Sequence, residues 1–369
     1  MKPNYTKSIV NIPATFLRHY NLATEHPSLP VIERLLGSYK HTVLIVLDGF
    51  GMNLLEHLED DAFLKQYLVD TLDSTFPSTT VAATTALLSG LTPYESGHVG
   101  WQQYLEDVDT HYAVFLDEDF YHSKKVVDPS LKSRFTYKRA LDRIQSVHPE
   151  VATHYFFPKP IDKDGYDTLS DGLKRYMKYQ SVRHKSLAYV YSTEPDKTEH
   201  FYGVEAEETK RLVRALNQTI TDFVKALNDD TLVLITADHG LVDVTPVPVF
   251  RHKNFTELLR ANPAIEPRAC AFFVKPGKED LFERRFNEYY GDDFTLYKSD
   301  MIIKMGLLGY GQKHPLIDLV LGDYMAVAKG DKYFGLTFDE SDAFKAHHAG
   351  LSDEEMEVPL IIYAPKGLI

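Results

Sequence analysis

The chain has one cysteine, Cys270, among its 369 residues. A single cysteine cannot form an intrachain disulfide, which fits a protein of a reducing compartment. The surrounding residues, RACAFFV, are mostly apolar. We therefore expect Cys270 to pack inside a buried strand and to have no chemical role.

Long apolar runs are also missing. No stretch reaches the roughly 18 apolar residues that a membrane-spanning helix needs. Residues 1–20 lack the continuous apolar segment of a signal peptide. We expect a soluble, cytoplasmic protein without a membrane partner.

Basic residues are too few to favour a nucleic-acid polymer as a partner. The 40 Lys and Arg stand against 53 Asp and Glu, which gives a net charge of -13. A broad nucleic-acid-binding face needs clustered Lys and Arg. Small phosphate-bearing substrates stay open, because bound divalent cations would reverse the local field.

Apolar runs alternate with amphipathic segments along the chain. This rhythm predicts an α/β fold with a doubly wound, mostly parallel central sheet and helices on both faces. The helical spacing of apolar residues predicts helices in the segments 137–147, 169–183 and 205–229. Seven apolar runs are expected as strands: 41–48, 151–157, 186–192, 231–237, 269–275, 316–323 and 357–364.

Residues 247–344 depart from this rhythm and are rich in Phe, Tyr and Lys. We expect them to form a smaller α+β cap, the alternative being that they extend the main sheet. Tyr289, Tyr290 and Phe294 in this stretch could stack on a base, although such residues more often form a core of their own.

Acidic side chains stand at or just beyond the ends of three expected strands: Asp48, Asp196 and Asp238. Sites in open parallel sheets form beyond the carboxyl ends of the strands, so we expect these three carboxylates to gather in one place. A turn-capping role is the alternative for Asp48.

Histidines accompany these carboxylates. Asp196 and His200 are four residues apart, so on a helical turn both can reach one cation, unless they form a surface pair. Asp238 and His239 precede Gly240, where the backbone can turn so that both side chains reach one metal.

Two further histidines, His347 and His348, stand in a polar loop before the last expected strand. Either could be a ligand.

Thr80 stands at the start of a helical segment, VAATTALLSG. Unpaired N–H groups and the helix dipole favour a phosphate there, and metal coordination could activate the hydroxyl as a nucleophile. The alternative is that Ser78, Thr79 or Thr80 only caps the helix. Three Asp, three His and one hydroxyl together supply what two-metal phosphoryl transfer requires.

The ordered segments VLIVLDGFG, FPSTT…LLSGLTPYESGHVGW, EPDKTEHFYG, ITADHG and HHAGLSDEEMEVPLI resemble a known family. They are similar to blocks of the type I phosphodiesterase/nucleotide pyrophosphatase branch of the alkaline phosphatase superfamily, from about residue 40 to the C-terminus. The resemblance implies a catalytic domain of residues 1–246 and 345–369 with the cap, 247–344, inserted.

The resemblance also implies roles for single residues. Thr80 would be the nucleophile of two in-line displacements through a phospho-threonine intermediate, on a small phosphate ester such as a nucleotide. One metal would be held by Asp196, His200 and His348, and the other by Asp48, Asp238 and His239 together with Thr80. Both metals are usually zinc in this family, and manganese is the alternative.

Two departures leave the substrate class open. Residues 81–83 read Val-Ala-Ala where the family's enzymes have Phe-Pro-Asn, and residues 100–102 read Gly-Trp-Gln where they carry a phosphate-binding Asn. The alternatives are a phosphomonoesterase or phosphonate hydrolase with the same metals, and a non-catalytic metal-binding protein. A sulfatase is disfavoured, since Thr80 stands where that reaction uses a modified Cys or Ser.

Overall fold

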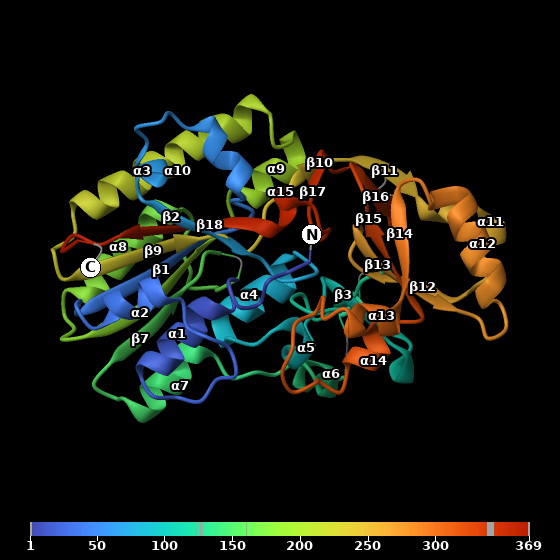
Figure 1. Ribbon diagram of the computed structural model, residues 1–369, viewed down its shortest axis with the longest axis horizontal. Coiled ribbons are helices and arrows are strands. Elements are labelled where there is room, and N and C mark those ends of the chain that lie inside the picture. Colours follow the sequence, from blue (N-terminus) through green and yellow to red (C-terminus); the bar gives the residue numbers. More distant parts are fainter. Residues whose placement is uncertain (1, 123, 126–127, 160, 338–342, 368–369) are drawn as a thin grey trace.

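The computed structural model describes residues 2–122, 124–125, 128–159, 161–337 and 343–367. Two large sheets lie side by side along its longest axis, each with its own helices (Figure 1). The fold is the mixed α/β architecture predicted from the sequence.

The main sheet has six strands. In spatial order they are β2 (Leu68–Asp73), β18 (Glu357–Tyr363), β9 (Thr231–Thr236), β1 (His41–Leu47), β8 (Ser186–Ser192) and β7 (Ala152–Phe156). The four strands from β9 to β7 are parallel, and β18 runs antiparallel to both of its neighbours. β1 and β8 are buried at every position, which explains their continuous apolar character.

Helices cover both faces of this sheet. One group comprises α1 (Asn11–His19), α2 (Pro30–Leu36), α4 (Thr80–Ser89) and α7 (Ala140–Val147), and the other α3 (Phe63–Gln66), α8 (Leu169–Gln180), α9 (Asp196–Tyr202) and α10 (Glu207–Lys225). α10 buries Val213, Leu216 and Ile220 at helical spacing, as its sequence predicts.

The second sheet has eight strands. Their order is β14 (Phe294–Lys298), β15 (Tyr324–Ala328), β13 (Ala269–Val274), β12 (Leu259–Ile265), β3 (Gln102–Leu105), β4 (Thr110–Ala113), β5 (Glu118–Asp119) and β6 (Lys124–Lys125). Strands from 259–328 therefore join strands from 102–125, while the division of the chain at residues 247 and 344 stays a prediction.

Shorter elements complete the structure. Around the second sheet lie α5 (Pro93–Ser96), α6 (Pro129–Ser133), α11 (Lys253–Thr256), α12 (Glu279–Tyr290), α13 (Ser299–Lys304) and α14 (Ile317–Val320). Two separate two-stranded sheets pair β10 (Val242–Asp243) with β17 (Ala346–His347) and β11 (Thr245–Pro248) with β16 (Lys332–Gly335). The rest are α15 (Asp353–Met356) and the 3-10 helices η1 (Met52–His57), η2 (Glu106–Val108) and η3 (Val249–Arg251).

The strand predicted over 316–323 is wrong. This segment contains α14, in which Ile317 and Val320 are buried and Leu319 is exposed. The apolar residues follow helical spacing, and Pro315 before them suits a helix start better than a sheet interior.

The aromatic residues of the second sheet form its own core. Tyr290 and Phe294 are buried in a cluster with Cys270 and Phe272, and Tyr289 packs against the same cluster.

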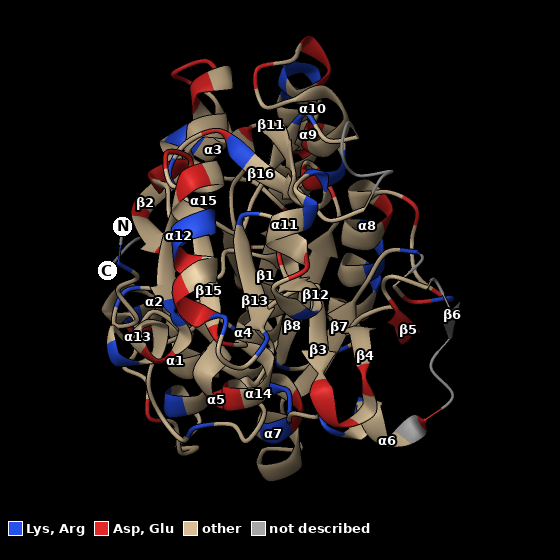
Figure 2. Ribbon diagram, turned by 90° about the vertical axis from the view of Figure 1, so that its right-hand side faces the viewer, with Lys and Arg blue, Asp and Glu red and all other residues tan. Residues whose placement is uncertain are grey.

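Acidic and basic segments alternate over α12 and its surroundings (Figure 2). Among the described residues, no helix combines the length and the apolar character needed to cross a membrane.

Candidate active site

The carboxyl ends of β1, β8 and β9 meet at one point. The Asp48 backbone N–H donates to Ser192 O at 3.0 Å, and the Asp196 N–H donates to Asp48 O at 2.9 Å. The Gly49 N–H donates to Asp238 Oδ1 at 3.1 Å. These bonds bring the three carboxylates together at the edge where the strand pattern predicts a site.

Two glycines allow this close approach. Gly49 has φ +78, and a Cβ there would lie 2.8 Å from the Cα of Asp196. A Cβ on Gly240 would lie 2.1 Å from the carbonyl oxygen of Glu354. Any side chain at either position would push the loops that carry these carboxylates and His239 apart.

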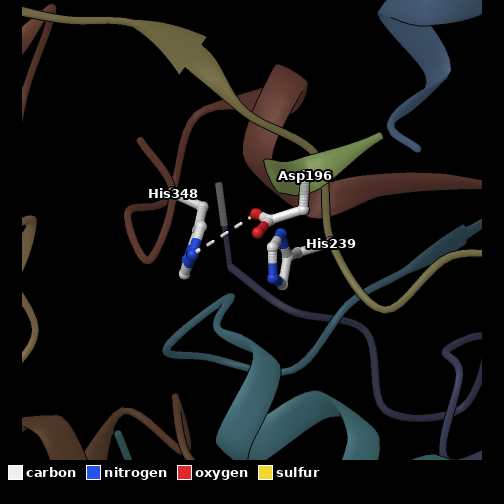
Figure 3. A group of neighbouring side chains, drawn as sticks. All are labelled: Asp196, His239 and His348. Atoms are coloured by element: carbon white, nitrogen blue, oxygen red, sulfur yellow. Dashed lines mark ion pairs between the residues drawn. The ribbon is translucent and has the colours of Figure 1, made fainter. Parts of the chain in front are cut away.

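Asp196, His239 and His348 form one group of facing side chains (Figure 3). His348 Nε2 lies 3.8 Å from Asp196 Oδ1, and the rings of His239 and His348 stack with centroids 3.9 Å apart. His200, on the next turn of α9, places its Nε2 3.2 Å from the same Asp196 oxygen.

Asp48, Asp238 and His239 form a second, fully buried group. His239 Nε2 lies 3.6 Å from Asp48 Oδ1 and 3.7 Å from Asp238 Oδ2. His239 thus faces both groups, and all six acidic and histidine residues expected at the site lie in one cluster.

Each carboxylate has one oxygen without a hydrogen-bond partner. The buried oxygens Asp48 Oδ1, Asp196 Oδ1 and Asp238 Oδ2 are all unsatisfied. The other oxygen of Asp48 accepts from the Tyr191 hydroxyl, and that of Asp238 accepts from the Gly49 and His239 N–H groups. A buried acceptor without a partner lowers the free energy of unfolding, unless a bound ligand interacts with it.

The three histidines all direct Nε2 into the cluster. The Nδ1 atoms of His200, His239 and His348 lie 2.8, 3.2 and 3.1 Å from the carbonyl oxygens of Ala346, Gly240 and Ser78. A carbonyl can only accept, so Nδ1 carries the proton of each neutral ring and leaves the lone pair on Nε2. Metal-binding histidines are oriented by bonds of this kind.

The electrostatics of the cluster favour a bound cation. The pKa of Asp48 lies well above its usual value because of burial and of the nearby Asp238 and Asp196 carboxylates. The pKa of His348 lies well below its usual value, because burial and the neighbouring histidines disfavour a proton. Unsatisfied carboxylate oxygens beside imidazole lone pairs fit divalent cations such as zinc.

The hydroxyls of Ser78, Thr79 and Thr80 do not cap α4. The N-cap, Thr79, makes no side-chain capping bond and donates instead to Glu266 Oε1 at 2.6 Å. Ser78 donates to Gly350 O at 2.9 Å. Thr80 Oγ1 lies 3.1 Å from His239 Nε2. The capping alternative is wrong, and the Thr80 oxygen faces the acidic and histidine cluster.

His347 has a different orientation from His348. Its Nδ1 accepts from the backbone N–H of His348 at 2.9 Å, and it belongs to neither group of facing ligand atoms among the described residues.

Two further residues at the site carry no sequence signal that predicts them. Tyr191 stands in an ordinary apolar strand, yet its hydroxyl donates to Asp48. Glu266 stands in the turn between β12 and β13, and its carboxylate accepts bonds from the Thr79 hydroxyl and from the Trp101 N–H. Both contacts depend on segments more than 100 residues apart in the chain.

The structure resembles solved proteins over most of its length. Murine ectonucleotide pyrophosphatase/phosphodiesterase 5, as an inactive threonine-to-alanine variant in complex with AMP, matches with a TM-score of 0.66 and 16% identity, covering 88% of each chain. The human protein of the same name matches with a TM-score of 0.66 and 14% identity, covering 88% of this chain and 87% of that one. These likenesses establish the fold.

Sequence comparison gives the family. Two curated relatives match part of the chain: ectonucleotide pyrophosphatase/phosphodiesterase family member 7 of Rattus norvegicus and of Mus musculus. Each is 34% identical to this chain over 90 residues, and the match covers 22% of this chain and 20% of the relative. The family model for type I phosphodiesterase/nucleotide pyrophosphatase matches residues 42–335, most of the chain. The chain therefore belongs to the type I phosphodiesterase/nucleotide pyrophosphatase family.

Proposed function

We propose that the protein hydrolyses small phosphodiesters, with Thr80 as the nucleophile between two divalent cations. The observation that carries this proposal is the position of Thr80. This residue begins helix α4, and its Oγ1 lies 3.1 Å from His239 Nε2. The oxygen thus faces the unsatisfied carboxylates of Asp48 and Asp238.

The same geometry supports two proposed ligand sets. Asp48, Asp238 and His239 would hold one cation beside Thr80. Asp196 and His348 would hold the other with His200, whose Nε2 is also directed at Asp196. Nitrogen and single carboxylate oxygens are ligands that suit zinc, with manganese as the alternative. Bound cations would neutralise the phosphate and lower the pKa of the Thr80 hydroxyl.

The chain's own groups supply the remaining parts of the reaction. The first N–H groups of α4 have no partner inside the helix and can donate to a phosphate oxygen. The Thr80 oxygen attacks phosphorus and one alcohol leaves, so that the phosphoryl group is esterified to Thr80. Water then breaks this ester in a second displacement and restores the threonine.

The relatives support the same chemistry. The murine structural neighbour binds AMP, and its threonine-to-alanine variant is described as inactive. A small phosphate ester such as a nucleotide is therefore the proposed substrate class, rather than a nucleic-acid polymer. A cytoplasmic location stays a prediction.

Hydrolysis of bis-p-nitrophenyl phosphate and p-nitrophenyl phosphate tests the proposal. We expect zinc-loaded protein to prefer the diester, and chelator-stripped protein and Thr80→Ala to lose nearly all turnover. Ser89→Ala, at the far end of the same helix, is the matched control and should keep normal activity. Near-normal turnover by Thr80→Ala would refute the nucleophile, and a preference for the monoester would change the substrate class to phosphomonoesters.

A further inference from the structure

Two cavities meet at Thr80. The smaller, about 250 Å³, is called here the Glu266 cavity, and its wall includes Gln102, Phe120, Glu266 and Phe344. The larger, about 530 Å³, is called the apolar cavity, and its wall includes Phe115, Leu116, Phe157 and Ile161. Both are also lined by Thr80, Trp101 and Asp196. A phosphate group at Thr80 would therefore border both cavities.

Glu266 is a buried carboxylate in the wall of the smaller cavity. Glu266 is only 2% exposed. Its Oε1 accepts from the Thr79 hydroxyl and from the Trp101 N–H, both at 2.6 Å. Two short bonds from donors to one oxygen favour the ionised form of a carboxyl group. An ionised Glu266 would place a negative charge against Thr79, the residue before Thr80.

The Glu266 cavity offers no side-chain cation for a second negative charge on the substrate. Its described lining residues include no Lys or Arg, so its positive charge would come from the cation proposed at Asp196, His200 and His348, which line the same cavity. Arg268, two residues beyond Glu266, directs its donors away from the cavity: Nε and one terminal nitrogen donate to Glu355, and the other donates to Lys332 O. Sites for phosphate groups normally carry such cations.

We propose that Glu266 makes the site selective for diesters by opposing a negatively charged oxygen in the cavity beside Thr80. This inference rests on the proposed function. In a diester, the group that enters the Glu266 cavity is an esterified oxygen with an uncharged or cationic substituent. In a monoester, the same position holds a bare anionic oxygen. At the short range of this cavity, like charges in a medium of low dielectric repel strongly.

Binding of two phosphate probes tests the role of Glu266 independently of turnover. Calorimetric titration of zinc-loaded protein with inorganic phosphate and with diethyl phosphate, at about pH 8 where inorganic phosphate is a dianion, compares the two charge states. In Glu266→Gln, the amide oxygen can still accept both bonds, so only the charge is lost. We expect this variant to bind inorganic phosphate about tenfold more tightly and diethyl phosphate nearly unchanged.

The exposed Glu257, which lines neither cavity, provides the matched control, because Glu257→Gln also removes one negative charge. It should leave both affinities unchanged. Turnover should follow binding: Glu266→Gln should narrow the preference for bis-p-nitrophenyl phosphate over p-nitrophenyl phosphate by about tenfold.

The outcomes separate the two proposals. If the wild type hydrolyses the diester but Glu266→Gln leaves the ratio of the two affinities unchanged, the role of Glu266 is refuted and the proposed function stands. If no form of the zinc-loaded protein hydrolyses either ester, the proposed function is refuted together with the diester selectivity built on it.

Discussion

Loss of the ion pair between Arg268 and Glu355 should destabilise the protein strongly. Arg268 is 1% exposed and Glu355 is fully buried. Arg268 Nε and a terminal nitrogen donate to the two Glu355 oxygens at 2.6 and 2.9 Å. Arg268→Met leaves the Glu355 charge buried without its partner, which costs about 3–5 kcal/mol of the free energy of unfolding.

A second variant isolates the charge as the cause. Glu355 also accepts from the Gly350 N–H at 2.7 Å and closes the capping box of α15. Glu355→Gln keeps one acceptor oxygen, which can bond either the Gly350 or the Ser352 N–H. The double variant Arg268→Met/Glu355→Gln contains no unpaired charge, so it should lose only about 1–2 kcal/mol and be more stable than Arg268→Met alone.

The effect should depend on pH. Burial raises the pKa of Glu355, but the charge and hydrogen bonds of Arg268 outweigh it, and the pKa lies below its usual value of 4.5. A group whose pKa is lowered by folding stabilises the protein above that usual value, and this contribution is lost as the pH falls toward the lowered pKa. The difference in the free energy of unfolding between wild type and Arg268→Met should therefore become smaller in acid.

Urea unfolding of zinc-loaded protein, followed by the fluorescence of the single tryptophan, Trp101, measures these free energies. Arg268→Met within about 1 kcal/mol of wild type at neutral pH would refute the reasoning. A double variant no more stable than the single one would refute the part assigned to the unpaired charge.

Three further expectations concern the acidic and histidine cluster. Asp238→Ala and His348→Ala should each lose bound metal by elemental analysis, and unchanged metal content in either would contradict the ligand sets. His347→Ala is the matched control and should keep its metal, since His347 Nδ1 is bonded to the backbone of His348. Tyr191→Phe frees the second oxygen of Asp48 and should change zinc affinity about 10–100-fold in competition with a chelator; an unchanged affinity would count against Tyr191 as an orienting group.

Much of the fold could be predicted from local pattern. Continuous apolar runs mark β1, β8 and β9 because each is buried on both faces. The second sheet was only partly predictable, because β3 to β6 are short strands of mixed polarity. Their place beside β12 depends on a long-range pairing, Ile265 with Gln102.

The same limit applies to the site. Strand ends and their order in the chain were enough to gather the carboxylates and histidines, whose roles as ligands stay a proposal. No local pattern could predict that Glu266 bonds Thr79 across 187 residues, or that Tyr191 bonds Asp48 across 143. Such contacts are set by tertiary packing, which a strand or turn signature does not contain.

The central claim is that the phosphoryl group passes through Thr80. Acid quenching of zinc-loaded protein during turnover of bis-p-nitrophenyl phosphate, followed by peptide mass spectrometry, tests this claim most directly. The account predicts that p-nitrophenyl phosphate is found esterified to Thr80, after release of one p-nitrophenol, and that Thr80→Ala forms no adduct. An adduct on another residue, or full turnover by Thr80→Ala, would contradict it.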